Sequence, residues 1–204
     1  MTTAGPTSHR TTAALIEHAA EQFGSKTFIK EGDRALSFAV VHEQVCYLAN
    51  TLVAHDFNHG DRAAIWAPNC AEWIIAALAI QYVGGTVVTV NTRYKASEAR
   101  DILADSGSTV AFVVKSFLGS NYAEALAEQD LPDLEHIVAL PSPDTKEQTT
   151  YHQWVSEGMS ASEAICSQRD AQRESVGPDT VSDILFTSGT TGRAKGVVTA
   201  HGQN

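Results

Sequence analysis

The stretch Asp183-Ile-Leu-Phe-Thr-Ser-Gly-Thr-Thr-Gly-Arg-Ala-Lys-Gly-Val-Val-Thr199 lies close to the C-terminal end of the 204-residue sequence. Its apolar run from Ile184 to Phe186 predicts a strand, which leads into six residues made only of Thr, Ser and Gly. A β-branched run from Val197 to Thr199 predicts a second strand soon afterwards. The stretch is therefore interpreted as a tight connection between two ordered strands and not as a flexible Ser/Gly linker.

The residues of this connection have the chemistry of a phosphate-binding loop. Gly189, Gly192 and Gly196 carry no Cβ and can adopt positive φ, so backbone N–H groups can turn toward an anion. Arg193 adds a planar cationic fork and Lys195 a point charge. No Asp or Glu occurs from the start of the connection to the C-terminus, although the chain has a formal charge of −10. The candidate phosphate-binding residues are Thr187, Ser188, Gly189, Thr190, Thr191, Gly192, Arg193 and Lys195.

Two other kinds of site do not fit this loop. Gly189 and Gly192 are separated by two residues where a Walker A loop needs four, and no GxGxxG occurs in the chain. Ser188 does not lie in a GxSxG elbow and has no assignable acid–base partner, which disfavours a catalytic nucleophile. No catalytic residue is assigned within the chain.

The segment from Thr187 to Val197 resembles the signature phosphate loop of the adenylate-forming superfamily, which contains acyl-CoA synthetases, luciferase-like enzymes and nonribosomal adenylation domains. Ala194 is one departure, because most members have proline there. The body of the chain is similar, in order and spacing, to the N-terminal half of acyl-CoA synthetases. The features that carry this likeness are Gly60-Asp61-Arg62 before an apolar strand, Pro68-Asn69, a tryptophan-containing helix, Gly84-Gly85 and a strand ending at Asn91.

The resemblance implies the N-terminal portion of an AMP-forming carboxylic acid:CoA ligase, of the fatty-acid–CoA ligase type, using ATP, Mg²⁺, coenzyme A and a small-molecule carboxylic acid. It implies that residues 1–180 form an α/β subdomain of the AMP-binding domain, that residues 181–204 begin the next part, and that the C-terminal domain is absent. Most Mg²⁺ and CoA ligands are then expected outside this chain, which we expect to be inactive alone. A nonribosomal-type adenylation domain, or a non-catalytic nucleotide-binding module, remains an alternative.

Composition narrows the other classes of function. An acidic chain without a run of basic residues does not favour nucleic-acid binding. Three cysteines without a CxxC pair fit a reducing, cytoplasmic compartment and inert thiols better than disulfides or zinc. Residues 1–12 contain no apolar segment typical of a signal peptide. A homo-oligomer is left open.

The fold class follows from helices and strands that alternate along the chain. Residues 73–90 contain no charge, but Gly84-Gly85 divides them into a helix, a turn and a buried β-branched strand, which argues against a membrane span. Alternating elements predict a mostly parallel sheet with helices on both faces. Further helices are expected from Thr11 or Thr12 to Gly24, from a Ser37 cap toward Gly60, from a Ser97 cap to Gly107, and over 122–128 and 151–158; strands over 27–30, 35–38, 62–67, 109–114 and 137–140; and an irregular connection over 160–180.

Histidines offer two weaker candidates. His55 and His59 are four residues apart, but no third residue has the spacing of a metal ligand, so we expect no metal site there. His201 follows the second strand of the loop hairpin. The resemblance places it near the substrate tunnel, whereas the residue considered alone favours a structural or surface role.

Overall fold

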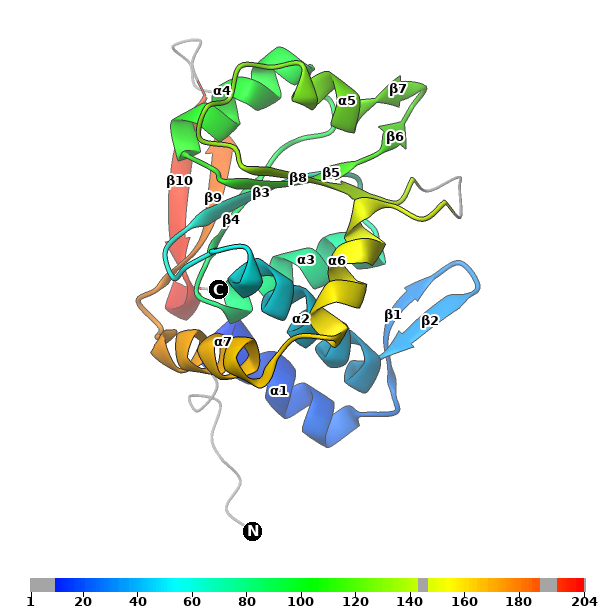
Figure 1. The fold of residues 1–204 in the computed structure, drawn as a ribbon, viewed down its shortest axis with the longest axis vertical. Coiled ribbons are helices and arrows are strands. Elements are labelled where there is room, and N and C mark those ends of the chain that lie inside the picture. The colour runs from blue at the N-terminus through cyan, green and yellow to red at the C-terminus, as the bar shows by residue number, and fades with distance from the viewer. Residues whose placement is uncertain (1–9, 143–146, 188–193, 204) are drawn as a thin grey trace.

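A computed structural model describes residues 10–142, 147–187 and 194–203 (Figure 1). Its helices are α1 (Thr12–Phe23), α2 (Phe38–Ala54), α3 (Ala71–Tyr82), α4 (Ala96–Ser106), α5 (Tyr122–Ala127), α6 (Thr150–Met159) and α7 (Glu163–Ser175), with a short 3₁₀ turn at His201–Gln203. Its strands are β1 (Thr27–Glu31), β2 (Arg34–Ser37), β3 (Arg62–Trp66), β4 (Thr86–Thr89), β5 (Val110–Val114), β6 (Ser116–Phe117), β7 (Ser120–Asn121), β8 (His136–Leu140), β9 (Val181–Thr187) and β10 (Lys195–Ala200).

The main sheet has six strands in the order β10-β9-β4-β3-β5-β8. Every neighbouring pair is parallel except β10 with β9, which is antiparallel at the edge. Strands β3 and β5 are buried along almost their whole length, as expected for parallel strands covered on both faces. The predicted mostly parallel α/β fold is confirmed.

Helices cover both faces of this sheet (Figure 1). Helices α4 and α5 lie on one face, while α2, α3 and α6 lie on the other, with α1 and α7 packed outside them. One core joins the layers, and its largest fully buried side chains include Phe57, Leu48, Ile75 and Phe112. Strand β10 lies at one edge of the sheet, with β9 beside it.

Most predicted element boundaries are confirmed, because local signals set them. The Thr11 side chain accepts the N–H of Ala14 at the start of α1, and Ser37 accepts that of Val40 at the start of α2. Gly84, with φ of 76°, lies in the turn between α3 and β4, so residues 73–90 are a helix, a turn and a strand. Within the described ranges, no helix is both long and apolar enough to cross a membrane.

Two local predictions are wrong, and one short hairpin was not predicted. Residues 160–180 are not an irregular connection, because Ser162 caps the 13-residue helix α7. This helix is polar overall and buries none of its residues, so its sequence resembles that of a surface loop. The cap of α4 is at Lys95 and not Ser97, since the Lys95 N–H donates to Glu98 Oε2 at 2.8 Å. The short β6–β7 hairpin, two residues a strand, has no signal in the sequence.

The sheet continues across the predicted boundary at residue 180. Strand β9 pairs in parallel with β4, with Val88 opposite Ile184, so residues on both sides of the boundary share one sheet. The division into 1–180 and 181–204 stays a prediction about the larger domain.

Candidate functional site

The predicted loop joins two strands that pair directly. Lys195 lies opposite Thr187 in the antiparallel register, and the Thr187 hydroxyl donates to the Lys195 carbonyl at 3.5 Å. We call β9 and β10 the β9–β10 arm. The predicted strand pair is therefore confirmed, and the two described ends of the loop face each other. The predicted site residues Ser188, Gly189, Thr190, Thr191, Gly192 and Arg193 lie outside the described residues.

The described cation of the loop is accessible. Lys195 is exposed at the first position of β10, and no ion pair with it forms within the part of the chain that the structure describes. An unpaired ammonium beside a segment without carboxylates is available to an anionic ligand. This arrangement is consistent with phosphate binding.

Gly196 has a different role from the one expected. It lies in β10 opposite Phe186 and is not among the described glycines with positive φ. A Cβ at this position would lie 2.9 Å from Ile184 Cγ2 and 3.4 Å from the Phe186 ring. The glycine thus permits close packing of side chains across the arm, and it does not use the positive φ that the absence of a Cβ would allow.

A cavity of about 530 Å³ opens at the carboxyl ends of β3, β4 and β9. Ligands of open parallel sheets bind in this kind of crevice. Its lining combines apolar surface from Trp73 and Phe186 with polar groups of Asn69 and Asn91. The Trp66 Nε1–H donates to the Asn91 carbonyl at 3.1 Å, which fixes the turn after β4. Because Phe186 directly precedes Thr187, the cavity adjoins the entrance to the loop.

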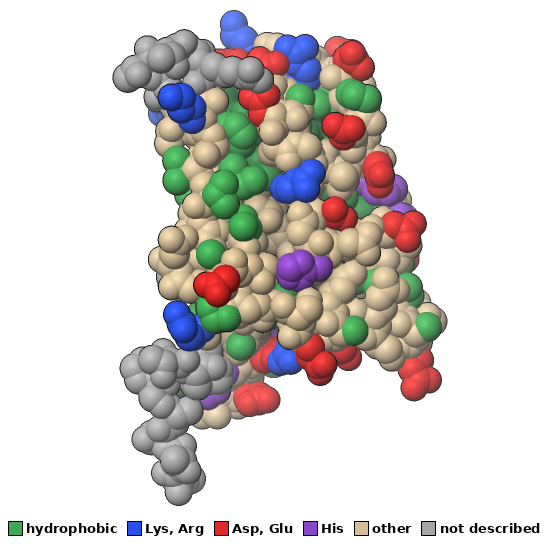
Figure 2. All heavy atoms as spheres, turned by 90° about the vertical axis from the view of Figure 1, so that its left-hand side faces the viewer, with side chains coloured by type: hydrophobic (Ala, Val, Ile, Leu, Met, Phe, Trp, Pro, Cys, Tyr) green, Lys and Arg blue, Asp and Glu red, His purple; other side chains and the backbone are tan. Residues whose placement is uncertain are grey.

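Part of the surface around the arm is apolar. Figure 2 views the molecule from the side of β10 and shows hydrophobic side chains gathered on this face. Leu185 and Val197, which are cross-strand partners, are both about half exposed, as is Val198. The chemistry of the arm is thus a cation at its tip and exposed apolar side chains along its length.

His201 lies at the other end of β10 from Lys195. Its ring is buried, and its Nδ1 accepts the backbone N–H of Thr12 at 3.3 Å and contacts the Thr12 hydroxyl at 3.1 Å. Burial lowers the pKa of His201, and the carboxylate of Asp183 opposes this shift. The ring therefore tends to stay neutral and ties β10 to the start of α1. Its proximity to a substrate stays a prediction.

The other candidates have structural partners. His55 stacks on Trp154 with ring centroids 4.9 Å apart, and its Nε2 lies 3.1 Å from a Glu157 carboxylate oxygen. Within the described ranges, no group of three His, Cys, Asp or Glu side chains could hold a metal ion. The three cysteines are free, and burial raises the pKa of the Cys70 thiol to about 11, which leaves little reactive thiolate near neutral pH.

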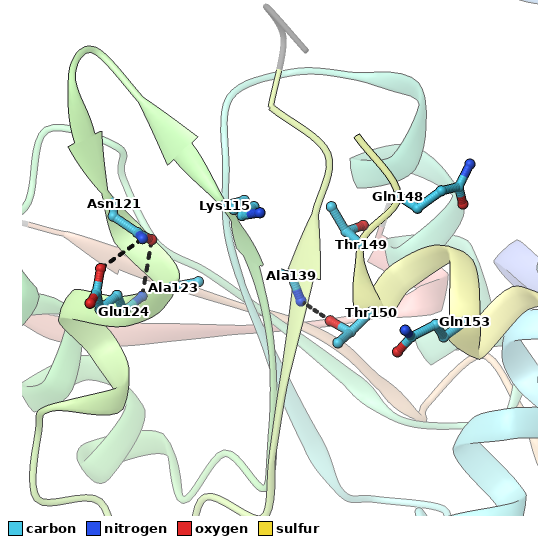
Figure 3. Close-up of a pocket in the computed structure, with 9 residues that line it drawn as sticks. All are labelled: Lys115, Asn121, Ala123, Glu124, Ala139, Gln148, Thr149, Thr150 and Gln153. Carbon is cyan, nitrogen blue, oxygen red and sulfur yellow. Dashed lines mark hydrogen bonds between the residues drawn. The ribbon is translucent and has the colours of Figure 1, made fainter. Parts of the chain in front are cut away.

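A second cavity, of about 310 Å³, lies between the starts of α5 and α6 (Figure 3). Its charged group and several of its polar groups are already paired: Lys115 with Glu147 at 2.6 Å, Asn121 with Glu124, and the Ala139 N–H with the Thr150 hydroxyl. A cavity whose charge and hydrogen bonds are satisfied within the protein offers little to a polar ligand. We assign no function to it.

Sequence analysis missed two residues beside the arm. Gln81, on α3, and Ser182, on β9, are buried and hydrogen-bonded at the base of the arm. One signal was visible, because Gln81 is the single amide side chain in the uncharged stretch 73–90. Ser182 offered no signal, because its burial depends on the β9–β10 pairing.

Comparison with known proteins places these features in a family. Residues 16–204 match the family model described as AMP-binding enzyme. The chain is 40% identical over 196 residues to 3-[(3aS,4S,7aS)-7a-methyl-1,5-dioxo-octahydro-1H-inden-4-yl]propanoyl:CoA ligase of Rhodococcus jostii (strain RHA1), covering 95% of this chain and 38% of the relative. The ligase of the same name from Mycobacterium tuberculosis (strain ATCC 25618 / H37Rv) is 39% identical, with 96% and 37% covered.

A solved structure shows the same fold. The inhibitor-bound N-terminal domain of FACL13 from Mycobacterium tuberculosis superposes with a TM-score of 0.74 at 25% identity, covering 94% of this chain and 44% of that one. The chain spans less than two-fifths of the length of the curated relatives it matches. The family match spans the sheet, the helices and the β9–β10 arm, and the chain belongs to the AMP-binding enzyme family.

Proposed function

We propose that the chain is the N-terminal part of an ATP-dependent, AMP-forming carboxylic acid:CoA ligase, an acid–thiol ligase. In this reaction a carboxylate attacks the α-phosphorus of ATP, giving an acyl-adenylate and pyrophosphate. The thiol of coenzyme A then displaces AMP to give the thioester. The observation that carries the proposal is the pairing of Thr187 with Lys195, which brings together the two ends of an acid-free, donor-rich loop in a family of AMP-binding enzymes.

The loop has an electrostatic role in this proposal. Backbone N–H groups, hydroxyls and two cations hold the β- and γ-phosphates of ATP, so that pyrophosphate is oriented as the leaving group. Each hydrogen bond to a charged phosphate oxygen contributes about 1.5–3 kcal/mol, so two or three donors decide whether ATP is held. The proposed ligands are Thr187, Ser188, Gly189, Thr190, Thr191, Gly192, Arg193 and Lys195.

Magnesium and coenzyme A are proposed to be held mainly by residues outside this chain. The described residues contain no trio of His, Cys, Asp or Glu suited to a metal, so no ligand for Mg²⁺ is assigned here. The cation would neutralise phosphate charge when bound. Lys195 would share that task from the protein side.

The carboxylic acid is proposed to carry a fused ring system. The two relatives at 40% and 39% identity are named for a propanoyl group on a methylated, dioxygenated bicycle. A linear fatty acid is the competing substrate class. The protein is further proposed to act in the cytoplasm, since no described helix could span a membrane and the cysteines are free.

Product analysis on the whole encoded protein tests this function. ATP, CoA and a panel of ring-bearing and linear acids would be supplied, and nucleotide products separated. The proposal predicts carboxylate-dependent formation of AMP, pyrophosphate and acyl-CoA, with ring-bearing acids turned over at lower concentration. Release of ADP and phosphate would overturn it, and transfer of the acyl group only to a carrier protein would favour a nonribosomal-type adenylation domain.

A further inference from the structure

The two ends of the β9–β10 arm differ in how they are held. At its base, Ser182 is fully buried, and its hydroxyl donates to the Thr199 carbonyl at 3.1 Å. Toward its tip, Leu185 and Val197 are 47% and 51% exposed. The paired register becomes irregular between Thr199 and Ala200, next to this buried bond. Polar side chains thus hold the arm at its base. Toward the tip, Ile184 and Phe186 pack against the core, while Leu185 and Val197 are about half exposed.

Helix α3 supplies a contact that crosses to this base. Gln81 is 7% exposed, and its Nε2 donates to Asp183 Oδ1 at 3.1 Å and, with a longer bond, to the Ser182 carbonyl at 3.4 Å. The amide group of Gln81 therefore donates to one side chain and one backbone carbonyl of β9. A buried amide satisfied in this way fixes the distance between helix and strand, because losing either partner leaves a polar group without compensation.

Three further hydrogen bonds hold the same end. The Thr86 hydroxyl, at the start of β4, donates to the Val181 carbonyl at 3.3 Å. His201 accepts the Thr12 N–H, and its own backbone N–H donates to the Thr180 carbonyl at 3.0 Å. Hydrogen bonds consequently connect the base of the arm to α3, β4 and α1. Among these contacts, the one from Gln81 reaches a carboxylate side chain of the arm.

We propose that Gln81 is a positioning residue for ATP binding, acting through Asp183 to set the position of the β9–β10 arm. The proposal rests on the proposed function of the loop. Thr187 is four residues beyond Asp183, or about 13 Å along an extended strand. Because β9 is paired with β4 from Asp183 to Leu185, a shift of the strand at Asp183 moves the start of the loop with it. Displacements of about 1 Å in a phosphate-binding site cost on the order of 10²-fold in rate.

The test replaces the amide without changing the length of the side chain. In the whole encoded protein, Gln81→Met should raise the KM for ATP about tenfold while leaving the KM for the carboxylic acid unchanged, since the loop is proposed to hold the phosphates of ATP and not the acid. Gln153→Met is the matched control, because Gln153 is exposed on α6. Hydrogen exchange should become faster in β9 and β10 and stay unchanged in β3.

Asp183 provides a second, gentler variant. Asp183→Asn keeps an oxygen that accepts the Gln81 amide and should stay within about twofold of wild type, whereas Asp183→Ala should match Gln81→Met. The double variant Gln81→Met/Asp183→Ala should be no worse than either single variant if the two residues act as a unit. Additive losses would overturn the proposal.

The outcomes separate this proposal from the one on which it rests. An unchanged KM for ATP in Gln81→Met, with an increased KM in Lys195→Ala, would overturn the role of Gln81 alone. Wild-type ATP kinetics in Lys195→Ala would instead remove the function proposed for the loop. Equal increases in KM for ATP and for the acid, with faster hydrogen exchange in β3, would mean that Gln81 stabilises the whole fold and does not position the arm specifically.

Discussion

The central strands and the β9–β10 arm show two ways of building a sheet. Strand β5 is buried at every position, whereas β10 is exposed over its first four residues, Lys195 to Val198. The central strands gain stability from apolar contact on both faces. The arm gains it mainly from pairing and from polar ties at its base, so it contributes less to the core and presents a cation and a loop.

This difference separates what makes the chain fold from what makes it bind. Substitutions in the central strands should change the free energy of unfolding, and substitutions at the tip of the arm should change ligand binding with little effect on stability. Each of the following changes tests one side of that comparison.

The largest effect is expected in β5. Phe112 is fully buried, so Phe112→Ala should lower the free energy of unfolding by about 3–5 kcal/mol through lost burial and a residual cavity. Val198→Ala, at a β10 position 57% exposed, should stay within about 0.5 kcal/mol of wild type. Urea denaturation of the 204-residue chain measures both. Similar losses at the two positions would contradict the comparison.

A smaller loss is expected where helices α2 and α6 touch. A Cβ at Gly158 would lie 1.7 Å from the Tyr47 carbonyl oxygen, so Gly158→Ala must push the helices apart and should cost about 1–3 kcal/mol. Gly177→Ala is the control, because a Cβ there meets no atom within 4 Å. Chemical denaturation of both variants gives the difference. An unaffected Gly158→Ala protein would mean that the two helices are not packed this closely.

Acid should loosen the base of the arm. Burial lowers the folded-state pKa of His201, so its stabilising contribution is complete above the ordinary histidine pKa of about 6.5 and is lost as pH falls below it. The pKa of His42 is lowered by burial and by Arg169, in the same direction. His201→Gln should therefore reduce the slope of stability against pH between about 6.5 and 5 without abolishing it. An unchanged slope in thermal unfolding across that range would exclude His201 as the cause.

The smallest effect is expected at Ala194, which adjoins the tip of the arm. Proline occupies this position in most members of the resembled superfamily, and it restricts the unfolded chain, so Ala194→Pro should stabilise by about 0.4–1 kcal/mol. Denaturation midpoints of the variant and wild type would measure the gain. A destabilised variant would show that the backbone before Lys195 follows a different path.

Sequence patterns predicted the parts of this fold that local chemistry controls. Caps at Thr11 and Ser37, the turn at Gly84 and the buried strand after it were all readable, because each depends on neighbours in the sequence. Helix α7 could not be predicted in this way, because polar side chains hold it against the rest of the chain. Arg173 pairs with Glu17, and Arg169 Nη1 donates to Asn50 Oδ1 at 3.0 Å. Such a helix carries few apolar side chains, so its sequence resembles that of a loop.

The candidate site could also be predicted only where it depends on neighbouring residues in the sequence. Residue types and spacing identified the loop, and the structure confirms that strands flank it. The ties of the arm involve residues far apart in the chain, such as Gln81 with Asp183 and Thr12 with His201, 102 and 189 positions apart. Periodicity cannot report contacts of that range. The predicted phosphate contacts themselves stay predictions.

The most direct test of the central claim compares two exposed lysines. In the whole encoded protein, Lys195→Ala should lower ATP–pyrophosphate exchange on the order of 10²-fold, because a cation at the leaving phosphates is lost, and Arg193→Ala should lower it less. Lys30→Ala, on the β1–β2 hairpin, removes an exposed cation outside the arm and should leave exchange unchanged. Both lysine variants should unfold at the wild-type urea midpoint. Wild-type exchange by Lys195→Ala and Arg193→Ala would contradict the assignment of the arm as the phosphate-binding element.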